Sequence, residues 1–372
     1  MTSEAESTAS VEATRRLDRL EGYLRSDPAN ESLLADAFVA ALAASAWDRA
    51  EFHLRHAQAL HLQPLVWSLH EAHWLLAQRR WSQARVALLG LGAQLLPGSA
   101  EEATVAHDLA YIDWQSGDVL AAIARLAPLL EGGDKPMAQP PALQALWVRL
   151  LHRAGELERA LQWLARSEAD GQLDPLAAGV GSLAALDDAD FKASLRWAEA
   201  ALQAGAVTSE ALVARASLAI AEQDVERARA LLERALVGNP DDGRIWSAIG
   251  FAELLGQRLD AARAAFARAV ATMPEHVGTW HGLGWTAIAQ QQLEAARAAF
   301  ARAVELDRNF AESHGGLAVV EALAGETSQA RASIGRALGL DRASLSARYA
   351  EALLAGDARN VEAVLRLGER LL

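Results

Sequence analysis

The sequence of 372 residues contains no cysteine, which excludes disulfides, thiolate metal sites, thiol catalysis and lipid attachment through cysteine. Lysine is almost absent, because Lys135 and Lys192 are the only two. Proline is also scarce, with 10 residues, and apolar residues make up 52% of the chain. A composition that is rich in Ala, Leu, Arg and Glu and poor in Pro favours helices over sheets or disorder. The composition therefore predicts an all-α protein.

Excess positive charge and long apolar runs are also lacking. The net charge of −13 disfavours a general nucleic-acid surface, since neutralising phosphates requires a basic face. The segment from Met1 to Arg16 lacks the apolar stretch of a signal peptide, and no later run approaches the roughly 18 apolar residues of a membrane span. We therefore expect a cytoplasmic protein without a membrane span, and the Arg-rich, Lys-poor usage is typical of a GC-rich bacterial genome.

What the sequence does contain is a repeat, which is clearest between Arg244 and Arg308. A set of residues recurs 34 positions later: Trp246, Ile249, Gly250, Ala262, Phe266 and Ala269 are followed by Trp280, Leu283, Gly284, Ala296, Phe300 and Ala303. A period of this length with two amphipathic helices per repeat is typical of a solenoid, in which no repeat buries its apolar face without its neighbours. The repeat predicts an α-solenoid of antiparallel helix pairs.

One small residue of this pattern can be projected along the chain. It falls at Ala50, Ala84, Ala122, Ala160, Ala193, Ala228, Ala262, Ala296, Ala330 and, less clearly, Val361. A large apolar residue follows four positions later in each repeat: Leu54, Leu88, Leu126, Leu164, Trp197, Leu232, Phe266, Phe300, Ile334 and Leu365. Such an i, i+4 pair lies on one face of the second helix. We expect the two helices of a repeat to approach closely at the Ala, opposite a small residue such as Gly250 or Gly284.

This register predicts about ten repeats plus a half-repeat at the N-terminus. Residues 1–12 are small, polar and acidic and are expected to form a disordered tail. Residues 13–204 form degenerate repeats with an inserted loop at 131–141, and residues 205–372 form consensus-like repeats that end in a capping helix. The last helix carries an apolar stripe without a polar cover, which suggests a homodimer through the C-terminal helix. The stripe comprises Val361, Val364, Leu365, Leu371 and Leu372.

The pattern resembles the tetratricopeptide repeat, whose consensus reads W-x2-L-G-x2-Y, then A-x3-F, then A and P. The resemblance is most specific from Trp246 to Pro274 and from Trp280 to Val304, and Glu253 and Ala287 occupy the Tyr position. It implies a right-handed superhelix whose first helices line a concave groove for extended peptides or a partner helix. Two subfamilies bind peptides through Asn or Lys of the first helices. This sequence does not match them, because its Asn residues lie near repeat boundaries and it has almost no Lys.

Aromatic and basic residues dominate the groove positions that this geometry implies. The candidates are His73, His107, Tyr111, Trp114, Arg149, His152, Arg153, Arg244, Phe251, His281, Trp285 and Glu312. Tyr, Trp and Arg provide large contact areas and charge-assisted bonds, so the lining suits a peptide with acidic and apolar side chains. The principal surface is expected between Tyr111 and Arg153. An aromatic stripe at helical spacing is also typical of a core, so Trp114 and Trp285 could instead fill gaps between repeats.

No constellation in the sequence predicts catalysis, a metal site or a cofactor. The segment from His70 to His73 has the wrong spacing for a two-histidine zinc helix, and no third ligand is evident. Neither a nucleophile with a base nor a phosphate-binding loop occurs. We therefore predict a non-enzymatic protein-interaction adaptor or chaperone that binds a partner polypeptide in its groove. The alternative is a non-catalytic regulatory or substrate-selecting subunit of a protein-modifying or secretion enzyme complex.

Overall fold

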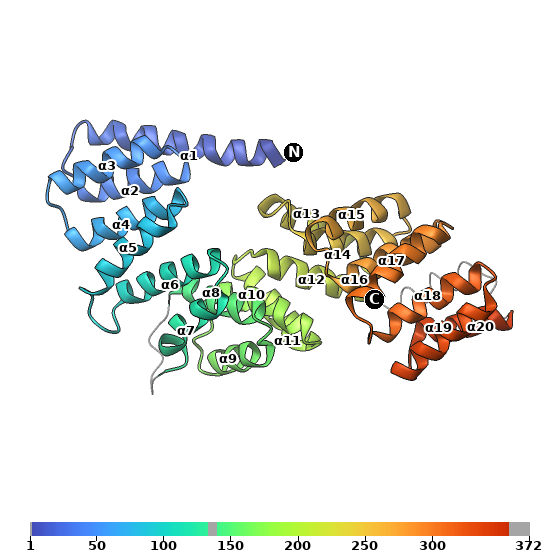
Figure 1. Cartoon of the computed structure of the whole chain (residues 1–372). Helices are drawn as coiled ribbons and strands as arrows, with labels where there is room; N and C mark the ends of the chain where they lie inside the picture. Colours follow the sequence, from blue (N-terminus) through green and yellow to red (C-terminus); the bar gives the residue numbers. More distant parts are fainter. Residues whose placement is uncertain (1, 133–139, 357–372) are drawn as a thin grey trace. The chain divides into compact units, whose positions relative to one another are not determined.

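The chain folds into helices throughout the part that the computed structural model describes, which is residues 2–132 and 140–356, with side chains from residue 11 onward (Figure 1). Within these residues there are 20 helices and no strand. Consecutive helices pack against each other in pairs, joined by short turns. The predicted all-α solenoid of helix pairs is confirmed. The chain divides into two compact units, Met1–Asp188 and Ala189–Leu372, which are described separately below.

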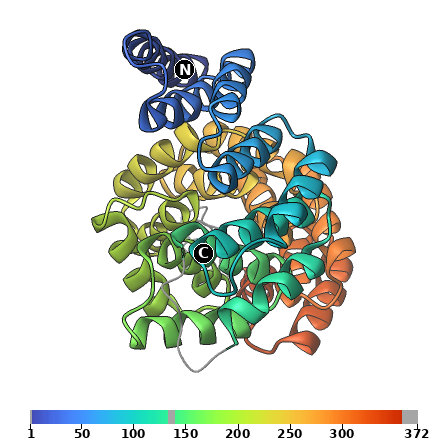
Figure 2. The same ribbon diagram turned by 90° about the vertical axis from the view of Figure 1, so that its left-hand side faces the viewer.

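The N-terminal unit contains ten helices. They are α1 (Thr2–Leu24), α2 (Glu31–Ala43), α3 (Trp47–Ala59), α4 (Pro64–Ala77), α5 (Trp81–Gly92), α6 (Ala100–Gln115), α7 (Val119–Leu130), α8 (Pro141–Arg153), α9 (Leu157–Ala169) and α10 (Pro175–Asp187). The first helices of the repeats are the even-numbered ones, and α8 packs directly against both α6 and α10. The N-terminal helices α1, α2 and α3 pack in succession, and Figure 2 shows this part of the chain in blue. Helices α6, α8 and α10 therefore lie side by side, and side-chain contacts join α2 to α4 and α4 to α6.

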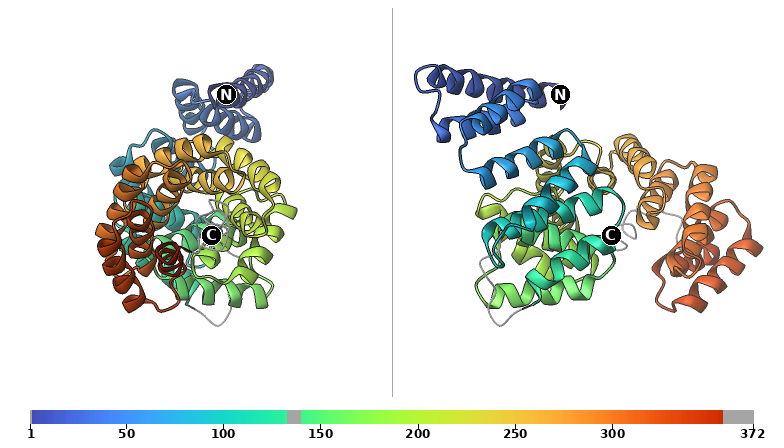
Figure 3. Two further views of the ribbon diagram at one scale, coloured as in Figure 1. Left: turned by 90° about the vertical axis from the view of Figure 1, so that its right-hand side faces the viewer. Right: turned by 60° about the vertical axis from the view of Figure 1, so that its left-hand side comes forward.

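The C-terminal unit contains the other ten helices. They are α11 (Phe191–Gln203), α12 (Ser209–Ala221), α13 (Val225–Gly238), α14 (Gly243–Leu255), α15 (Leu259–Thr272), α16 (Val277–Ala289), α17 (Leu293–Leu306), α18 (Ala311–Leu323), α19 (Thr327–Leu340) and α20 (Leu345–Ala355). The even-numbered helices from α12 to α20 again contact one another in succession. Figure 3 shows these pairs following each other from yellow to red. Both units thus repeat the same arrangement of a first helix, a turn and a second helix.

The projected small and large residues form the core of each repeat. All nine projected Ala residues that the structure describes are buried, and eight of them have no exposed surface. The large residue four positions later is also buried in each case, with at most 7% exposure. Burying one such side chain contributes roughly 1.5–3 kcal/mol. The predicted register is therefore confirmed from Ala50 to Ile334.

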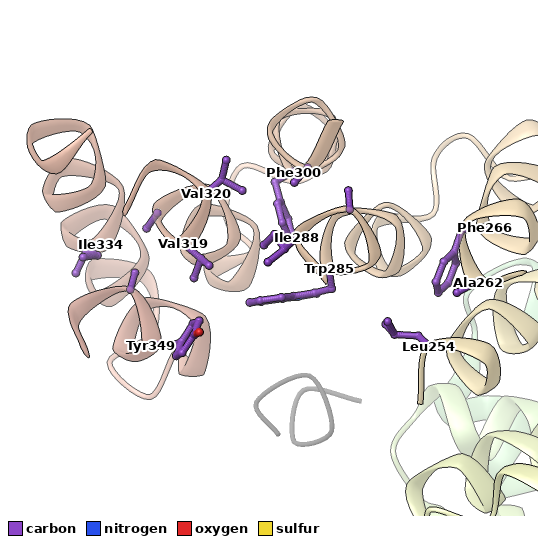
Figure 4. Close-up of a cluster of buried hydrophobic side chains, with 14 residues drawn as sticks. Leu254, Ala262, Phe266, Trp285, Ile288, Phe300, Val319, Val320, Ile334 and Tyr349 are labelled. Carbon is purple, nitrogen blue, oxygen red and sulfur yellow. The ribbon is translucent and has the colours of Figure 1, made fainter. Parts of the chain in front are cut away.

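Close approach between helices is set by glycines that face the large residue rather than the Ala. A Cβ atom on Gly250 would lie 2.6 Å from the Phe266 ring, and one on Gly282 of the next repeat would lie 2.3 Å from the same ring. Gly284 and Gly316 enclose Phe300 in the same way. We expected Gly250 to lie opposite the Ala, but the atoms nearest to its position belong to the Phe266 ring. Figure 4 shows the rings of Phe266 and Phe300 among the buried side chains of this cluster. Each Phe thus connects its own repeat to the next one.

Adding a methyl group at Gly282 is expected to lower the stability of the C-terminal unit. Forced overpacking typically costs about 1–3 kcal/mol, which exceeds the gain of about 1 kcal/mol from replacing Gly with Ala in a helix. Gly335 of α19 is the matched control, because a Cβ there meets no atom within 4 Å. Urea unfolding should show a lower midpoint for Gly282→Ala and a higher midpoint for Gly335→Ala. Equal shifts in the same direction would contradict the role of the ring.

The turn inside each repeat uses one left-handed residue. Gly117, Gly155 and Gly325 have φ of 85°, 76° and 80°, as expected for glycines in these turns. The same position, five residues before the buried Ala, is occupied by Gln257 with φ 56° and Gln291 with φ 59°. The turn geometry is thus kept in repeats that lack the glycine, at a cost of roughly 1–2 kcal/mol per residue. Tertiary packing of the two helices therefore overrides the local preference of Gln.

Three sequence-based predictions concern the ends and the loop. Helix α1 begins at Thr2, whereas a disordered tail was expected for residues 1–12. The segment is rich in Ala and Glu, which are strong helix formers, and it extends a helix whose Leu17 and Leu24 are buried. Residues 133–139 of the predicted loop at 131–141 lie outside the described part. So does the apolar stripe from Val361 to Leu372.

No helix in the described part of the chain combines the length and the apolar character needed to cross a membrane.

Candidate functional site

The first helices α4, α6 and α8 carry seven of the twelve predicted groove residues, all in the N-terminal unit. Two of them share one buried carboxylate. Nε2 of His73 lies 3.0 Å from Asp108 Oδ2, and Nδ1 of His107 lies 2.9 Å from Asp108 Oδ1. Burial of Asp108 opposes its ionisation, but the hydrogen bonds from His107 and His73 outweigh this effect, so its pKa is lowered. The carboxylate therefore holds both imidazoles in place and links α4 to α6.

A row of three aromatic side chains follows one turn further along α6. Tyr111 lies between Trp114 of the same helix and Trp81 at the start of α5. The ring centroids are 6.1 Å apart for Trp81 and Tyr111 and 6.0 Å apart for Tyr111 and Trp114, and both pairs meet edge to face. All three side chains are partly exposed. We call Trp81, Tyr111 and Trp114 the aromatic row.

Helix α8, which packs against α6, carries the predicted basic residues. His152 Nε2 lies 2.7 Å from Asp187 Oδ2 of α10, so it repeats the bridge between first helices that His73 makes to Asp108. Arg149 is partly buried, and Arg153, the last residue of α8, is exposed. The surface of α4, α6 and α8 thus combines aromatic rings, partly exposed histidines and one exposed guanidinium. We call it the first-helix surface.

The predicted groove residues of the C-terminal unit are used mainly for packing. Trp285 is buried, with 7% exposure and its ring 5.6 Å from Phe300, and Phe251 packs edge to face on Phe266. His281 donates to or accepts from Ser313 at 2.8 Å, and burial lowers its pKa to about 4. For Trp285 the structure therefore shows the packing alternative.

The remaining two candidates are partly buried and lie in first turns of α14 and α18. Glu312 accepts hydrogen bonds from the backbone N–H groups of Leu345 and Ser346, at 2.9 and 3.1 Å. These donors begin α20, so the carboxylate caps the next first helix. Arg244 is half-buried at the start of α14. Both residues belong to the C-terminal unit, whereas the aromatic row belongs to the N-terminal unit.

Buried carboxylates at the Tyr position of the repeat were not recognised as a pattern in the sequence. Glu253 occupies this position and lies 3.2 Å from Nε of Arg229, which belongs to the second helix of the preceding repeat. Asp113 occupies the corresponding position in α6, 2.6 Å from Arg85 of α5 and 2.9 Å from Arg125 of α7. Both carboxylates are at least nine-tenths buried. The sequence does contain a signal for these ion pairs. In both cases the acidic residue stands nine positions before the buried Ala of its own repeat, and its Arg partner stands one position after the buried Ala of the preceding repeat.

Histidines and carboxylates do not gather into a metal-binding group in the described residues. No three His, Asp or Glu side chains lie close enough together there to hold an ion. His70 illustrates why, because its ring is enclosed by Phe38 and Trp67 at 4.9 Å each. Burial lowers the pKa of His70 to about 4. His70 thus contacts aromatic rings, and His53, His73 and His107 each contact a single carboxylate.

Comparison with known families decides the nature of the repeat. The family model described as "Tetratricopeptide repeat" matches residues 219–283 and 253–320, which include α14 to α17. This part of the chain belongs to the tetratricopeptide repeat family. The match falls on the repeats whose Ala and Phe positions agree best with the consensus. The same register of buried residues extends from these tetratricopeptide repeats to the other helix pairs. No curated protein matches the chain significantly.

Three solved structures that resemble this chain are distant from it in sequence. YrrB, described as a TPR protein with an unusual peptide-binding site, is 15% identical over 50% of this chain and 97% of its own, with a TM-score of 0.38. PilF of Pseudomonas aeruginosa is 18% identical over 52% of this chain and 90% of its own, with a TM-score of 0.41. The Cut9–Hcn1 hetero-tetramer of the APC/C is 14% identical, covering 95% of this chain and 80% of the other, with a TM-score of 0.43.

Proposed function

We propose that this protein is an adaptor or chaperone that holds a segment of a partner polypeptide on the first-helix surface of its N-terminal unit. Tetratricopeptide repeats generally serve as protein-interaction scaffolds, and the family supports that coarse role. The aromatic row supports the specific surface. Tyr and Trp provide large contact areas at low entropic cost, and they are enriched in the energetically dominant parts of interfaces.

The charge of the surface suggests the chemistry of the partner. Arg153 is exposed at the end of α8. Arg80 precedes Trp81 in the chain, is exposed, and holds its guanidinium 5.1 Å from the centroid of the Trp74 ring. A guanidinium that reaches solvent can bind a carboxylate in a bidentate fashion. Apolar side chains of the partner would contact the rings, and acidic side chains would contact the arginines. We therefore propose a partner segment with acidic and apolar residues.

Photo-crosslinking from the row tests this proposal. Benzoylphenylalanine at Tyr111 is expected to cross-link a segment of a partner that carries acidic and apolar residues, identified by mass spectrometry. Val86 of α5 is the matched control, because it is 72% exposed and lies on a second helix of the same repeat region. Arg153→Glu should reduce the cross-link from Tyr111 several-fold, because a like charge then faces the acidic partner. Equal cross-linking from Tyr111 and Val86 would overturn the assignment of the surface.

The identity of the cross-linked chain also distinguishes an adaptor from the alternative function and tests self-association. A catalytic chain that is cross-linked at Tyr111 would favour a regulatory or substrate-selecting subunit of an enzyme complex. A cross-link to another copy of this protein would support self-association. The homodimer through the C-terminal helix stays a prediction, because residues 357–372 lie outside the described part. Location in the cytoplasm and a bacterial source also stay predictions.

A further inference from the structure

The polar atoms of the aromatic row are not used inside the protein. Several other indoles find an acceptor, as Trp163 does with the Leu130 carbonyl at 3.1 Å and Trp280 with the Pro274 carbonyl at 2.9 Å, whereas those of Trp147 and Trp197 are buried without one. Within the described residues, the indole N–H groups of Trp81 and Trp114 and the hydroxyl of Tyr111 make no such bond, and none of these atoms is buried. The row therefore presents three hydrogen-bond donors to solvent, next to three ring surfaces.

The aromatic row offers a ligand more hydrogen-bond donors than acceptors. An indole N–H only donates, and among the three groups only the Tyr111 hydroxyl can also accept. An α-helix has little to offer such a surface, because its backbone carbonyls are already bonded internally. An extended β-segment brings one N–H for every carbonyl, and these N–H groups would lack acceptors on the row. The complement is a segment with free carbonyls and few N–H groups.

A proline-rich segment meets both requirements. Proline has no backbone N–H, and a polyproline II helix has no internal hydrogen bonds, so its carbonyls are available. Its rise of about 3.1 Å per residue places every second residue about 6.2 Å apart. This spacing is close to the centroid separations of 6.1 and 6.0 Å along the row. Aromatic-lined grooves with this character bind such segments in unrelated protein folds.

We infer that Trp81, Tyr111 and Trp114 bind a proline-rich segment of the partner in the polyproline II conformation, with their N–H and O–H groups donating to its backbone carbonyls. This inference rests on the proposed function and specifies the conformation of the partner. Acidic residues next to the prolines would then lie within reach of the exposed arginines, as proposed above. The preordered ligand loses little entropy on binding.

Nuclear magnetic resonance of the full chain labelled with nitrogen-15 at tryptophan tests the inference, with a blocked octaproline peptide as the probe. The indole N–H signals of Trp81 and Trp114, assigned from Trp81→Phe and Trp114→Phe, are expected to shift on titration. The signals of Trp163 and Trp280 should stay unchanged, since their donors already bind carbonyls. Trp114→Phe keeps a ring but removes the donor, so it should weaken binding by about tenfold. Trp280→Phe is the matched control and should bind octaproline like the wild type.

Two results would overturn the inference: no shift of the Trp81 and Trp114 signals with octaproline, or equal shifts with a blocked Gly-Ser octapeptide. If Trp114→Phe bound octaproline with wild-type affinity, the indole N–H would not contribute to binding, and the inference would also be overturned. The two proposals fail in different ways. If octaproline does not bind but Tyr111 still cross-links an acidic and apolar partner segment, the polyproline conformation is excluded and the surface is retained. If neither occurs, the surface itself is excluded.

Discussion

Replacing Ala296 with leucine is expected to lower the free energy of unfolding of the C-terminal unit by about 3 kcal/mol, at the upper end of the range for overpacked cores. Ala296 has no exposed surface and belongs to the core cluster that contains Phe266, Phe300 and Trp285. Three additional carbon atoms can be accommodated only if α16 and α17 move apart. Because each repeat is stabilised by its neighbours, that separation also weakens the contacts of α18.

The neighbouring residue provides the control. Ala295 lies on the same helix and is exposed. Ala295→Leu therefore adds the same three carbon atoms on the solvent side of α17 and should alter the free energy of unfolding by less than about 0.5 kcal/mol. Urea unfolding compares the two variants with the wild type. Hydrogen exchange of the amides in α16 and α17 should be faster in Ala296→Leu and unchanged in Ala295→Leu. A wild-type midpoint for Ala296→Leu would show that the repeats do not need a small residue there.

Replacing Glu253 with glutamine is expected to cost about 2 kcal/mol at neutral pH. Glu253 is 8% exposed and accepts from Arg229 of the preceding repeat and from Arg258 in the turn that follows. Hydrogen bonds to charged groups contribute about 1.5–3 kcal/mol, and a glutamine amide can accept through only one atom. Arg258 is half exposed, so water replaces part of the interaction that it loses in Glu253→Gln. Glu226 is the control, because it pairs with the same Arg229 at 2.7 Å but is 84% exposed, and Glu226→Gln should cost less than about 0.5 kcal/mol.

The contribution of Glu253 should also depend on pH. The hydrogen bond from Arg258 outweighs the desolvation of the carboxylate, so the pKa of Glu253 is lowered from its ordinary value of 4.5. A lowered pKa in the folded state stabilises the fold above the ordinary value, and this stability is lost as the pH falls through the folded pKa. The difference in unfolding free energy between wild type and Glu253→Gln should therefore be constant near pH 7 and decrease below about pH 4.5. A difference that is independent of pH down to pH 3 would contradict the ion pairs.

The candidate site could be predicted from the sequence only in part. Tyr111, Trp114 and Arg153 were predicted because their positions in the repeat register place them on first helices, and the structure shows the rings of Tyr111 and Trp114 in contact on α6 and Arg153 exposed at the end of α8. Trp81 was missed, because it begins a second helix and reaches the row only through the packing of α5 against α6. Trp285 has the same repeat position as Tyr111 but is buried against Phe300. The position in the repeat thus sets the direction of a side chain, while its neighbours determine whether it remains accessible.

The sequence by itself determined the fold class, the helix pairs and the core positions, because a recurring Ala with a large apolar residue four positions later can be buried only when helices pack in register. Only the tertiary structure decided how side chains from different repeats combine. Phe266 lies between glycines of two repeats, Asp108 holds two histidines from two helices, and Glu253 pairs with an Arg 24 residues earlier. These contacts depend on distances between helices, which the period of a repeat does not specify.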